Sequence, residues 1–321
     1  MAMRVLVTGG AGFIGSHYVR SLLDQEDDPP RVTVLDKFTY AGNLANLAGH
    51  LNRCDVIEGD IRDGELLHSL LPGHDLVVNF AGETHVDRSI RSGQEFVLSN
   101  TTGVETLARA CLDTGTPRLV QVSTDEVYGS ISEGSWDETT PLSPNSPYAA
   151  AKAGGDFLAL SYARTHGLDV RVTRCSNNYG PYQFPEKLIP RFVTNLLEGE
   201  RLPLYGSGTN VREWVHVDDH CRGIQLVAEH GEPGEVYHIS GDDTLSNLEV
   251  VEMLLELCGA DWNSVDRVED RKGHDLRYAL NDNRLRELGY RPRIGFREGL
   301  SETVRWYVDN PAWWKPLRQL I

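Results

Sequence analysis

The segment Thr8-Gly9-Gly10-Ala11-Gly12-Phe13-Ile14-Gly15 decides the fold, because it joins a strand-length apolar run, Arg4–Thr8, to a helix-length stretch, Phe13–Asp24. Its glycines let the backbone turn tightly and approach a pyrophosphate, whose charge a helix N-terminus favours. We therefore predict a dinucleotide site at this first strand–helix turn.

An acidic residue further along the chain supports this prediction. Asp36 ends the next apolar run, 21 positions beyond Gly15. A carboxylate there can hold the adenosine ribose hydroxyls and would repel a 2′-phosphate, so it favours NAD over NADP, although neighbouring Lys37 weakens that preference. Asp60, after the third run, is either an adenine contact or the N-cap of a helix over Arg62–Leu71.

Strand-length and helix-length segments alternate through the first half of the chain. The expected strands are Arg4–Thr8, Val32–Leu35, Asp55–Ile57, Leu76–Phe80, Leu119–Val122 and Val170–Thr173, and the expected helices are Phe13–Asp24, Gly64–Leu71, Glu95–Thr114 and Tyr148–Thr165. The strands lack period-two alternation, as strands buried on both faces do. The pattern predicts an α/β fold with a doubly wound parallel Rossmann sheet.

The pattern loosens after residue 176, where Asn177–Pro181 is a cluster of turn-forming residues. We expect a NAD-binding domain over 1–176 and a smaller substrate-binding lobe over 177–321, with a strand near 236–239 rejoining the sheet. The tail Trp313–Pro316 is expected to pack against its own lobe.

Composition excludes several function classes. The 321 residues are 40% hydrophobic and carry a net charge of −16, which argues against a nucleic-acid surface. The five scattered cysteines suit reduced thiols in a cytosol, and no Cys/His spacing indicates a metal. Because Arg4–Thr8 already reads as a strand, we expect no signal peptide, and no apolar run approaches about 20 residues. We expect a cytoplasmic protein with no membrane, metal or nucleic-acid partner.

Tyr148 and Lys152 stand four residues apart at the start of a predicted helix, so they share one face. An ammonium beside a phenol lowers the phenol pKa, and we expect the Tyr148 pKa to fall toward neutrality. A phenolate can take a hydroxyl proton while hydride leaves the same carbon. The same spacing is also common in surface pairs on helices.

Asp125 and Glu126 follow the fifth predicted strand, at the carboxyl end where α/β sites form. Two adjacent carboxyl groups can hold different protonation states where their surroundings differ. Eliminating water needs an acid for the leaving hydroxyl and a base for a carbon-bound proton. An exposed acidic loop is the alternative interpretation.

Together, the T-G-x-x-G-x-x-G start and the later Y-x-x-x-K resemble the extended short-chain dehydrogenase/reductase superfamily. Further segments narrow the resemblance to the dTDP-glucose 4,6-dehydratases over nearly the whole chain: Glu83–Ser89, Ser123–Gly129, Asn177–Tyr182, Pro185–Leu188 and Arg212–Trp214. The resemblance also implies a homodimer formed through the helices at Glu95–Thr114 and Tyr148–Thr165.

The resemblance implies a role for each residue of the central group. Tyr148, assisted by Lys152, takes the C4 hydroxyl proton of the sugar as hydride passes to NAD, and Thr124 bonds the C4 oxygen. Glu126 then removes the C5 proton and Asp125 protonates the departing C6 hydroxyl. Return of the hydride to C6 gives the 4-keto-6-deoxy sugar nucleotide and restores NAD.

Binding residues follow from the same resemblance. The cofactor residues are Gly9, Gly12, Phe13, Ile14, Gly15, Asp36, Lys37, Asp60, Ile61, Phe80, Ala81, Ser99, Tyr148, Lys152 and Asn178. The nucleotide-sugar residues are Thr84, Thr124, Asn177, Glu186, Lys187, Pro203, Leu204, Tyr205, Arg212, Asn247, Arg271, Lys272 and His274. A diphosphate suits a guanidinium fork with nearby cations, whereas Asn247 is equally well explained as a helix N-terminal residue.

Two other functions stay open. A nucleotide-sugar 4-epimerase or decarboxylase would share the cofactor site and the Tyr148/Lys152 pair, and the Asp125-Glu126 pair argues against it. A non-catalytic NAD-sensing regulator would have no need of all five central residues.

Overall fold

The computed structural model describes residues 2–25 and 27–321 and is built around a seven-stranded parallel sheet. The strand order is β10-β6-β5-β4-β1-β2-β3, and every neighbouring pair is parallel. The strands are β1 (Arg4–Thr8), β2 (Arg31–Asp36), β3 (Cys54–Glu58), β4 (Leu76–Asn79), β5 (Arg118–Thr124), β6 (Asp169–Cys175) and β10 (Val236–Ile239). The predicted doubly wound Rossmann fold is confirmed.

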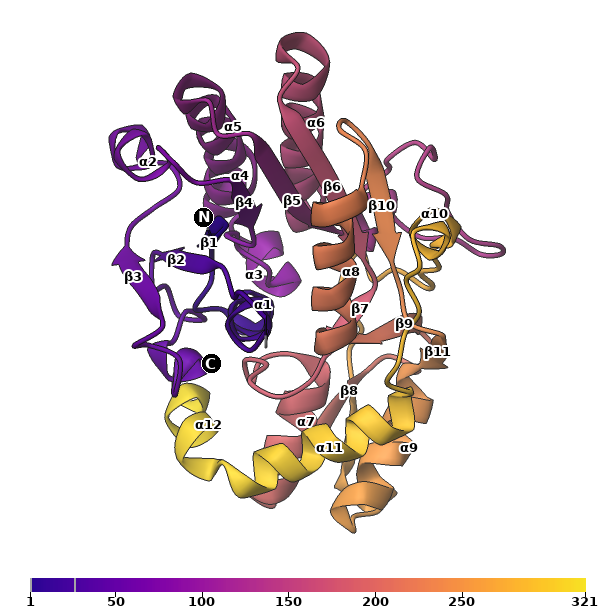
Figure 1. Cartoon of the computed structure of the whole chain (residues 1–321). Helices are drawn as coiled ribbons and strands as arrows, with labels where there is room; N and C mark the ends of the chain where they lie inside the picture. The colour runs from indigo at the N-terminus through magenta and orange to yellow at the C-terminus, as the bar shows by residue number, and fades with distance from the viewer. Residues whose placement is uncertain (1, 26) are drawn as a thin grey trace.

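Helices cover both faces of this sheet (Figure 1). One face packs against α1 (Phe13–Leu23) and α8 (Val217–His230), and the other against α2 (Gly64–Leu70), α5 (Gly103–Thr114) and α6 (Pro147–His166). Burial on two faces explains why the strands are apolar throughout instead of alternating.

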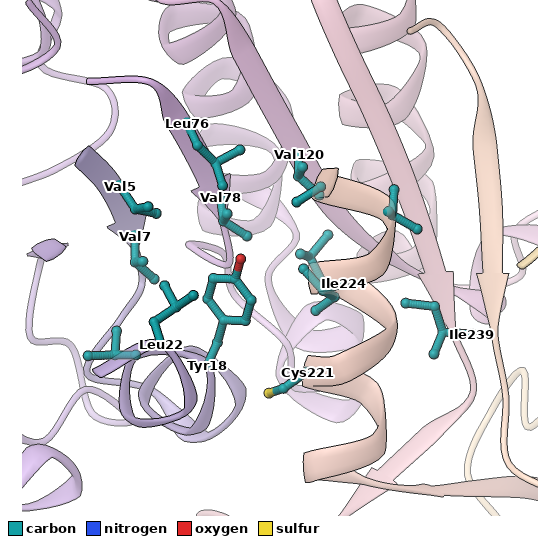
Figure 2. Packing of buried hydrophobic residues seen from close by; sticks show 14 of the residues in the cluster. Val5, Val7, Tyr18, Leu22, Leu76, Val78, Val120, Cys221, Ile224 and Ile239 are labelled. Carbon is teal, nitrogen blue, oxygen red and sulfur yellow. The ribbon is translucent and has the colours of Figure 1, made fainter. Parts of the chain in front are cut away.

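The core beneath α1 and α8 is shown in Figure 2, where Tyr18 and Ile224 face Val78 and Val120 of the sheet. All four side chains are fully buried. The Tyr18 hydroxyl donates to Gln225 Oε1 at 2.6 Å, which satisfies its polar end and ties α1 to α8. The glycine turn at the start of α1 therefore sits on a rigid two-helix layer.

Two predicted helix boundaries need correction. The helix expected at Glu95–Thr114 is α4 (Gln94–Val97), a π-helical turn over Leu98–Thr102, and α5. Single π-helical turns inside helices often lie at functional sites, and this one carries Ser99. The helix after β3 begins at Gly64 with Asp63 as its N-cap, so the N-cap interpretation of Asp60 is wrong.

A smaller lobe follows β6 and contains two short sheets, β11-β9-β7 and β12-β8. Its strands are β7 (Asn177–Tyr179), β8 (Leu202–Tyr205), β9 (Val211–His216), β11 (Asp243–Ser246) and β12 (Val265–Val268). Its helices are α7 (Leu188–Leu197), α9 (Asn247–Cys258), α11 (Phe296–Asp309) and α12 (Pro311–Arg318), whereas α10 (Asn283–Glu287) packs against β10 and the core of the large sheet. A core of its own, centred on residues such as Phe192 and Leu300, holds most of the lobe together.

The chain crosses between the two halves more than once. Residues 217–239 return to the large sheet as α8 and β10. A strand at 236–239 thus rejoins the sheet as expected, and the structure shows that its partner is β6. The division at residue 176 stays a prediction from the sequence. Within the described residues, no helix has both the length and the apolar character that a membrane span needs.

Candidate active site

The glycine turn after β1 forms a close-packed cradle. Gly9 has a φ of +68°, and a Cβ there would lie 2.6 Å from the Ala81 nitrogen. A Cβ on Gly15 would lie 2.3 Å from the Gly9 carbonyl oxygen. Because α1 has no side-chain cap and no acidic residue in its first turn, its N-terminus is free to attract an anion. These features fit the pyrophosphate of a dinucleotide.

Asp36 lies at the carboxyl end of β2 and lines the same cavity. Its carboxylate accepts the main-chain N–H groups of Ala11 at 2.9 Å and Phe38 at 2.8 Å. Burial raises the Asp36 pKa, and the two main-chain hydrogen bonds oppose that rise. The side chain therefore fixes the glycine turn while it stands where ribose hydroxyls would bind.

Asp60 is held by two cations at the rim of this cavity. Its carboxylate lies 3.0 Å from Lys37 Nζ and 2.7 Å from Arg62 Nη2. Burial raises the Asp60 pKa, but the hydrogen bonds from Arg62 and Lys37 outweigh it and lower the value to about 2. Asp60 is therefore an ionised residue of the cavity wall, and its contact with adenine stays a prediction.

Thr124, Asp125 and Glu126 form the turn that ends β5. The Thr124 hydroxyl donates to Asp125 Oδ1 at 3.1 Å and accepts the Glu126 N–H at 3.3 Å. The other carboxylate oxygen of Asp125, Oδ2, is buried without a hydrogen-bond partner. An unpaired buried oxygen is costly, and a bound hydroxyl group would satisfy it.

The two carboxyl groups stand in different electrostatic surroundings. Burial and the Glu126 charge hold the Asp125 pKa well above its usual range. Burial also raises the Glu126 pKa, but Arg271, Lys187 and Arg212 oppose that rise. Asp125 is thus the better proton donor and Glu126 the better base, which is the division that an elimination requires.

Tyr148 lies in the first turn of α6, after an N-cap at Ser146 whose side chain accepts the Ala149 N–H. Burial holds the Tyr148 pKa well above its usual value, and the charges of Glu126 and Asp125 add to this. The expectation that Lys152 lowers this pKa is therefore wrong for the chain alone, because burial and two nearby carboxyl groups dominate.

Lys152 is buried one turn further along α6, where burial lowers its pKa. Its ammonium donates to the Val122 carbonyl oxygen at 2.6 Å. The lysine therefore fastens α6 to β5 directly beside the Thr124–Glu126 turn.

A second cavity, of about 220 Å³, adjoins the first, of about 340 Å³, and both are lined by Glu126, Glu186 and Lys187. Arg212 is buried in the wall of the second cavity. Its guanidinium lies over the Tyr278 ring, 4.2 Å from the ring centre, and donates to the Asp275 carbonyl oxygen. Arg271 Nε is buried without a partner. Guanidinium groups held in this way suit a diphosphate.

Glu186 and Lys187 stand at the junction of the two cavities. The Tyr40 hydroxyl donates to Glu186 Oε1 at 3.0 Å, and Arg88 Nη2 lies 3.4 Å from Glu186 Oε2. Lys187 donates to the Thr84 carbonyl oxygen at 2.8 Å. Both side chains are thus pre-oriented by protein contacts.

The structure brings nearly all of the predicted site residues together. All fifteen cofactor residues named from the sequence line the first cavity, and so does Thr124. The second cavity takes the remaining substrate residues except Lys272, namely Thr84, Asn177, Glu186, Lys187, Pro203, Leu204, Tyr205, Arg212, Asn247, Arg271 and His274. Lys272 is exposed outside both cavities. Asn247 is both the first residue of α9 and a lining residue.

Sequence reasoning missed several lining residues. They include Tyr40, Glu83, Trp313 and Leu317 in the first cavity and Asp87, Arg191 and Tyr278 in the second. Tyr40 follows β2 closely enough to be suspected from its position alone. The C-terminal residues gave no such signal, because their contact depends on a chain reversal far along the sequence.

Comparisons with known proteins agree with this geometry. A family model described as GDP-mannose 4,6 dehydratase matches residues 6–303. A dTDP-glucose 4,6-dehydratase of Streptomyces antibioticus is 58% identical over 322 aligned positions, covering 99% of this chain and 96% of that protein. The chain belongs to the dTDP-glucose 4,6-dehydratase family.

Solved structures show that the dTDP-glucose 4,6-dehydratase family shares its fold with other nucleotide-sugar enzymes. DesIV, a dTDP-glucose 4,6-dehydratase from Streptomyces venezuelae solved with NAD and TYD bound, is 59% identical with a TM-score of 0.95, over 98% of this chain and 100% of that one. A UDP-glucose 4-epimerase from Thermotoga maritima, solved with UDP-glucose, is 30% identical with a TM-score of 0.89, over 96% and 100%. Dehydratases and epimerases thus share the fold, and this chain lies nearer the dehydratases.

Proposed function

We propose that this chain is an enzyme that converts dTDP-glucose to dTDP-4-keto-6-deoxyglucose with NAD held in the first cavity. The observation that carries the proposal is the adjacent Asp125–Glu126 pair, whose members stand in different electrostatic surroundings beside Tyr148. A 4-epimerase moves no proton at C5 and expels no hydroxyl at C6, so it has no use for this pair.

The oxidation depends on Tyr148, Thr124 and Lys152. When bound, NAD supplies a positively charged ring that accepts hydride from C4 and later returns it at C6. Tyr148 takes the C4 hydroxyl proton as a phenolate, a form that the positive charge of bound NAD would favour over the neutral phenol of the chain alone. The Thr124 hydroxyl, whose hydrogen bond also lowers the Tyr148 pKa, orients the C4 oxygen. Lys152 holds the helix that carries Tyr148 against β5.

The elimination depends on the carboxyl pair. A ketone at C4 acidifies the C5 proton, which the Glu126 carboxylate removes. The C6–O bond breaks as Asp125 gives its proton to the hydroxyl, and water leaves. Glu126 afterwards returns its proton to C5. Tyr148 releases the proton from the C4 hydroxyl to solvent and Asp125 regains a proton from solvent, so all three side chains are ready for the next cycle.

Product analysis tests the proposal. Purified protein incubated with dTDP-glucose should form the 4-keto-6-deoxy product without net NADH, because the cofactor is restored in each cycle. Appearance of dTDP-galactose instead would establish an epimerase. No conversion, with NAD bound, would favour a sensor. A parallel incubation with UDP-glucose tests which nucleobase the enzyme prefers in its substrate, and we expect thymine.

We also propose that two copies form a homodimer through α6 and the segment that contains α4 and α5, with α3 (Val86–Arg91) packed beside α6. Ile90, Val97 and Phe157 on these helices are 40%, 50% and 59% exposed. Because α3 and α4 both pack against α6, these exposed apolar side chains lie on neighbouring helices, as is typical of a contact surface. The cytoplasm is the compartment we propose, because all five cysteines are free thiols.

A further inference from the structure

The last helix, α12, carries two residues that reach the first cavity. Trp313 and Leu317 are four residues apart, so they share one helix face, and both line the cavity beside the glycine turn. Trp314 behaves differently, because it is buried in the core of its own lobe and donates to the Tyr307 carbonyl oxygen at 2.7 Å. The expectation that the tail packs against its own lobe is confirmed for both tryptophans, and Trp313 lines the first cavity as well.

Hydrogen bonds connect Trp313 to the cofactor cradle. Trp313 Nε1 donates to Asn46 Oδ1 at 2.9 Å, across 267 residues of sequence. Asn46 is buried, and its Nδ2 donates to the Ala11 carbonyl oxygen at 2.9 Å. The Ala11 N–H in turn donates to Asp36 Oδ2 at 2.9 Å. The C-terminal helix is therefore linked to the residue expected at the ribose.

Aromatic contacts hold the same tryptophan in place. Its ring centroid lies 5.0 Å from that of Trp306 and 5.7 Å from that of Tyr182. The Arg20 guanidinium of α1 lies over the other side of this group, 4.4 Å from the Tyr182 ring centre. Tyr182 has a φ of +64°, a conformation that costs free energy and persists only where surrounding contacts impose it.

The opposite side of α12 is fixed to the smaller lobe. Lys315 Nζ lies 2.9 Å from Glu198 Oε1, and Arg318 donates to Asn195 Oδ1 at 3.0 Å. Figure 1 shows α12, in yellow, reaching from α11 to the side of the sheet that carries β2 and β3. One short helix therefore joins the lobe to the wall of the first cavity.

We propose that α12 is a clasp that retains the dinucleotide, with Trp313 and Leu317 as positioning residues. The proposal rests on NAD binding in the first cavity. An enzyme that takes hydride from a substrate and returns it to the same molecule must keep its reduced cofactor throughout the cycle. Trp313, hydrogen-bonded to Asn46 at the cavity rim, opposes dissociation of the cofactor without touching the reacting atoms.

The release rate of NADH tests the clasp. Protein loaded with NADH is mixed with excess NAD, and release is followed by nicotinamide fluorescence in a stopped-flow instrument. Trp313→Ala should release NADH about tenfold faster, the factor expected for losing one hydrogen bond and one aromatic contact. Trp313→Phe and Leu317→Ala should show smaller increases. Trp262→Ala is the matched control, because Trp262 is a 46% exposed tryptophan of the smaller lobe that lines neither cavity.

Two further measurements distinguish the possible results: the melting temperature of each variant, and NADH binding by the wild-type protein. Trp313→Phe and Leu317→Ala leave the other contacts of α12 intact, so they keep the test decisive if Trp313→Ala unfolds. If Trp313→Phe and Leu317→Ala both released NADH at the wild-type rate, with unchanged melting temperatures, the proposal that α12 retains the dinucleotide would be overturned. Failure of the wild-type protein to bind NADH at all would instead overturn the proposed function.

Discussion

Lys152 donates its buried ammonium to the main-chain oxygen of Val122 at 2.6 Å, so the lysine of the Y-x-x-x-K motif braces strand β5. The phenol of Tyr148 stands on the same helix, beside the Thr124–Glu126 turn that follows this strand. The brace therefore sets the spacing between the proton acceptor and the carboxyl pair.

Tyr148→Phe should bind NAD and fold normally but lose substrate oxidation, because no phenolate can form to take the C4 hydroxyl proton. The loss of a positioned base typically costs about 10²–10⁴-fold. Single-turnover absorbance of the reduced nicotinamide after mixing with dTDP-glucose measures this step. Tyr162→Phe on the same helix, whose hydroxyl donates to Glu105, is the control. Near-normal oxidation in Tyr148→Phe would remove the residue from the mechanism.

Asp125→Asn and Glu126→Gln should spare the oxidation and block the elimination. Each keeps the shape of its side chain but loses the carboxylic proton or the carboxylate base. Both variants should accumulate bound NADH from dTDP-glucose and release product about 10²–10⁴-fold more slowly in a rapid-quench time course. Wild-type product release from both would refute the dehydratase assignment and leave the epimerase as the leading function.

Asp36→Ala should weaken NAD binding by about 10–100-fold, the range expected for losing hydrogen bonds to a charged group. Two effects combine, since the carboxylate would bind the ribose and also holds the Ala11 and Phe38 N–H groups of the turn. Isothermal titration with NAD measures the change. Asp55→Ala on the exposed edge of β3 should leave affinity unaltered. An unchanged affinity in Asp36→Ala would contradict this role.

Glu213 should make stability depend on pH. Burial raises its pKa to about 7, although the Leu280 N–H donates to its carboxylate. Between the unfolded value near 4.3 and the folded value, the native state binds the extra proton, so the free energy of unfolding falls as pH rises through this window. Urea unfolding at pH 5 and pH 8 measures how far the free energy of unfolding falls between the two values. This fall should be smaller in Glu213→Gln than in the wild type, by on the order of 3 kcal/mol.

The control for that measurement is Glu252→Gln, because Glu252 is exposed on α9. Its unfolding free energy should follow the wild-type pH dependence. Parallel curves for the wild type and Glu213→Gln would show that the Glu213 proton is not linked to folding.

Phe157→Glu should dissociate the proposed homodimer. A charged side chain in the centre of an apolar contact is left without solvent or a partner. Sedimentation velocity should show a dimer for the wild type and a monomer for the variant. Phe157 lies outside both cavities, so NAD affinity should persist. A wild-type monomer at micromolar concentration would reject the dimer.

The sequence predicted the sheet and the first cavity well because their signals are local. The Gly9–Gly15 turn, Asp36 and the Tyr148–Lys152 spacing each follow from a short segment with one backbone geometry. Lys272 and Arg271 are neighbours in sequence, yet only Arg271 lines a cavity, because the loop that carries them fixes their directions.

Other properties depend on contacts that no short segment contains. The raised Tyr148 pKa reflects burial of the phenol and the charges of Glu126 and Asp125, which follow strand β5. The Trp313–Asn46 hydrogen bond joins the two ends of the chain. The π-helical turn at Leu98–Thr102 interrupts a segment whose apolar spacing reads as one helix.

The outer strand of the sheet has a consequence for how the chain is made. β10 completes the sheet beside β6, but it is synthesised only after the intervening segment Asn177–His216, which belongs to the smaller lobe. Until residue 239 leaves the ribosome, β6 is an open edge with unpaired main-chain groups, which is a surface prone to wrong pairing. A fragment ending at residue 176 lacks β10 and keeps this edge open, so it should aggregate.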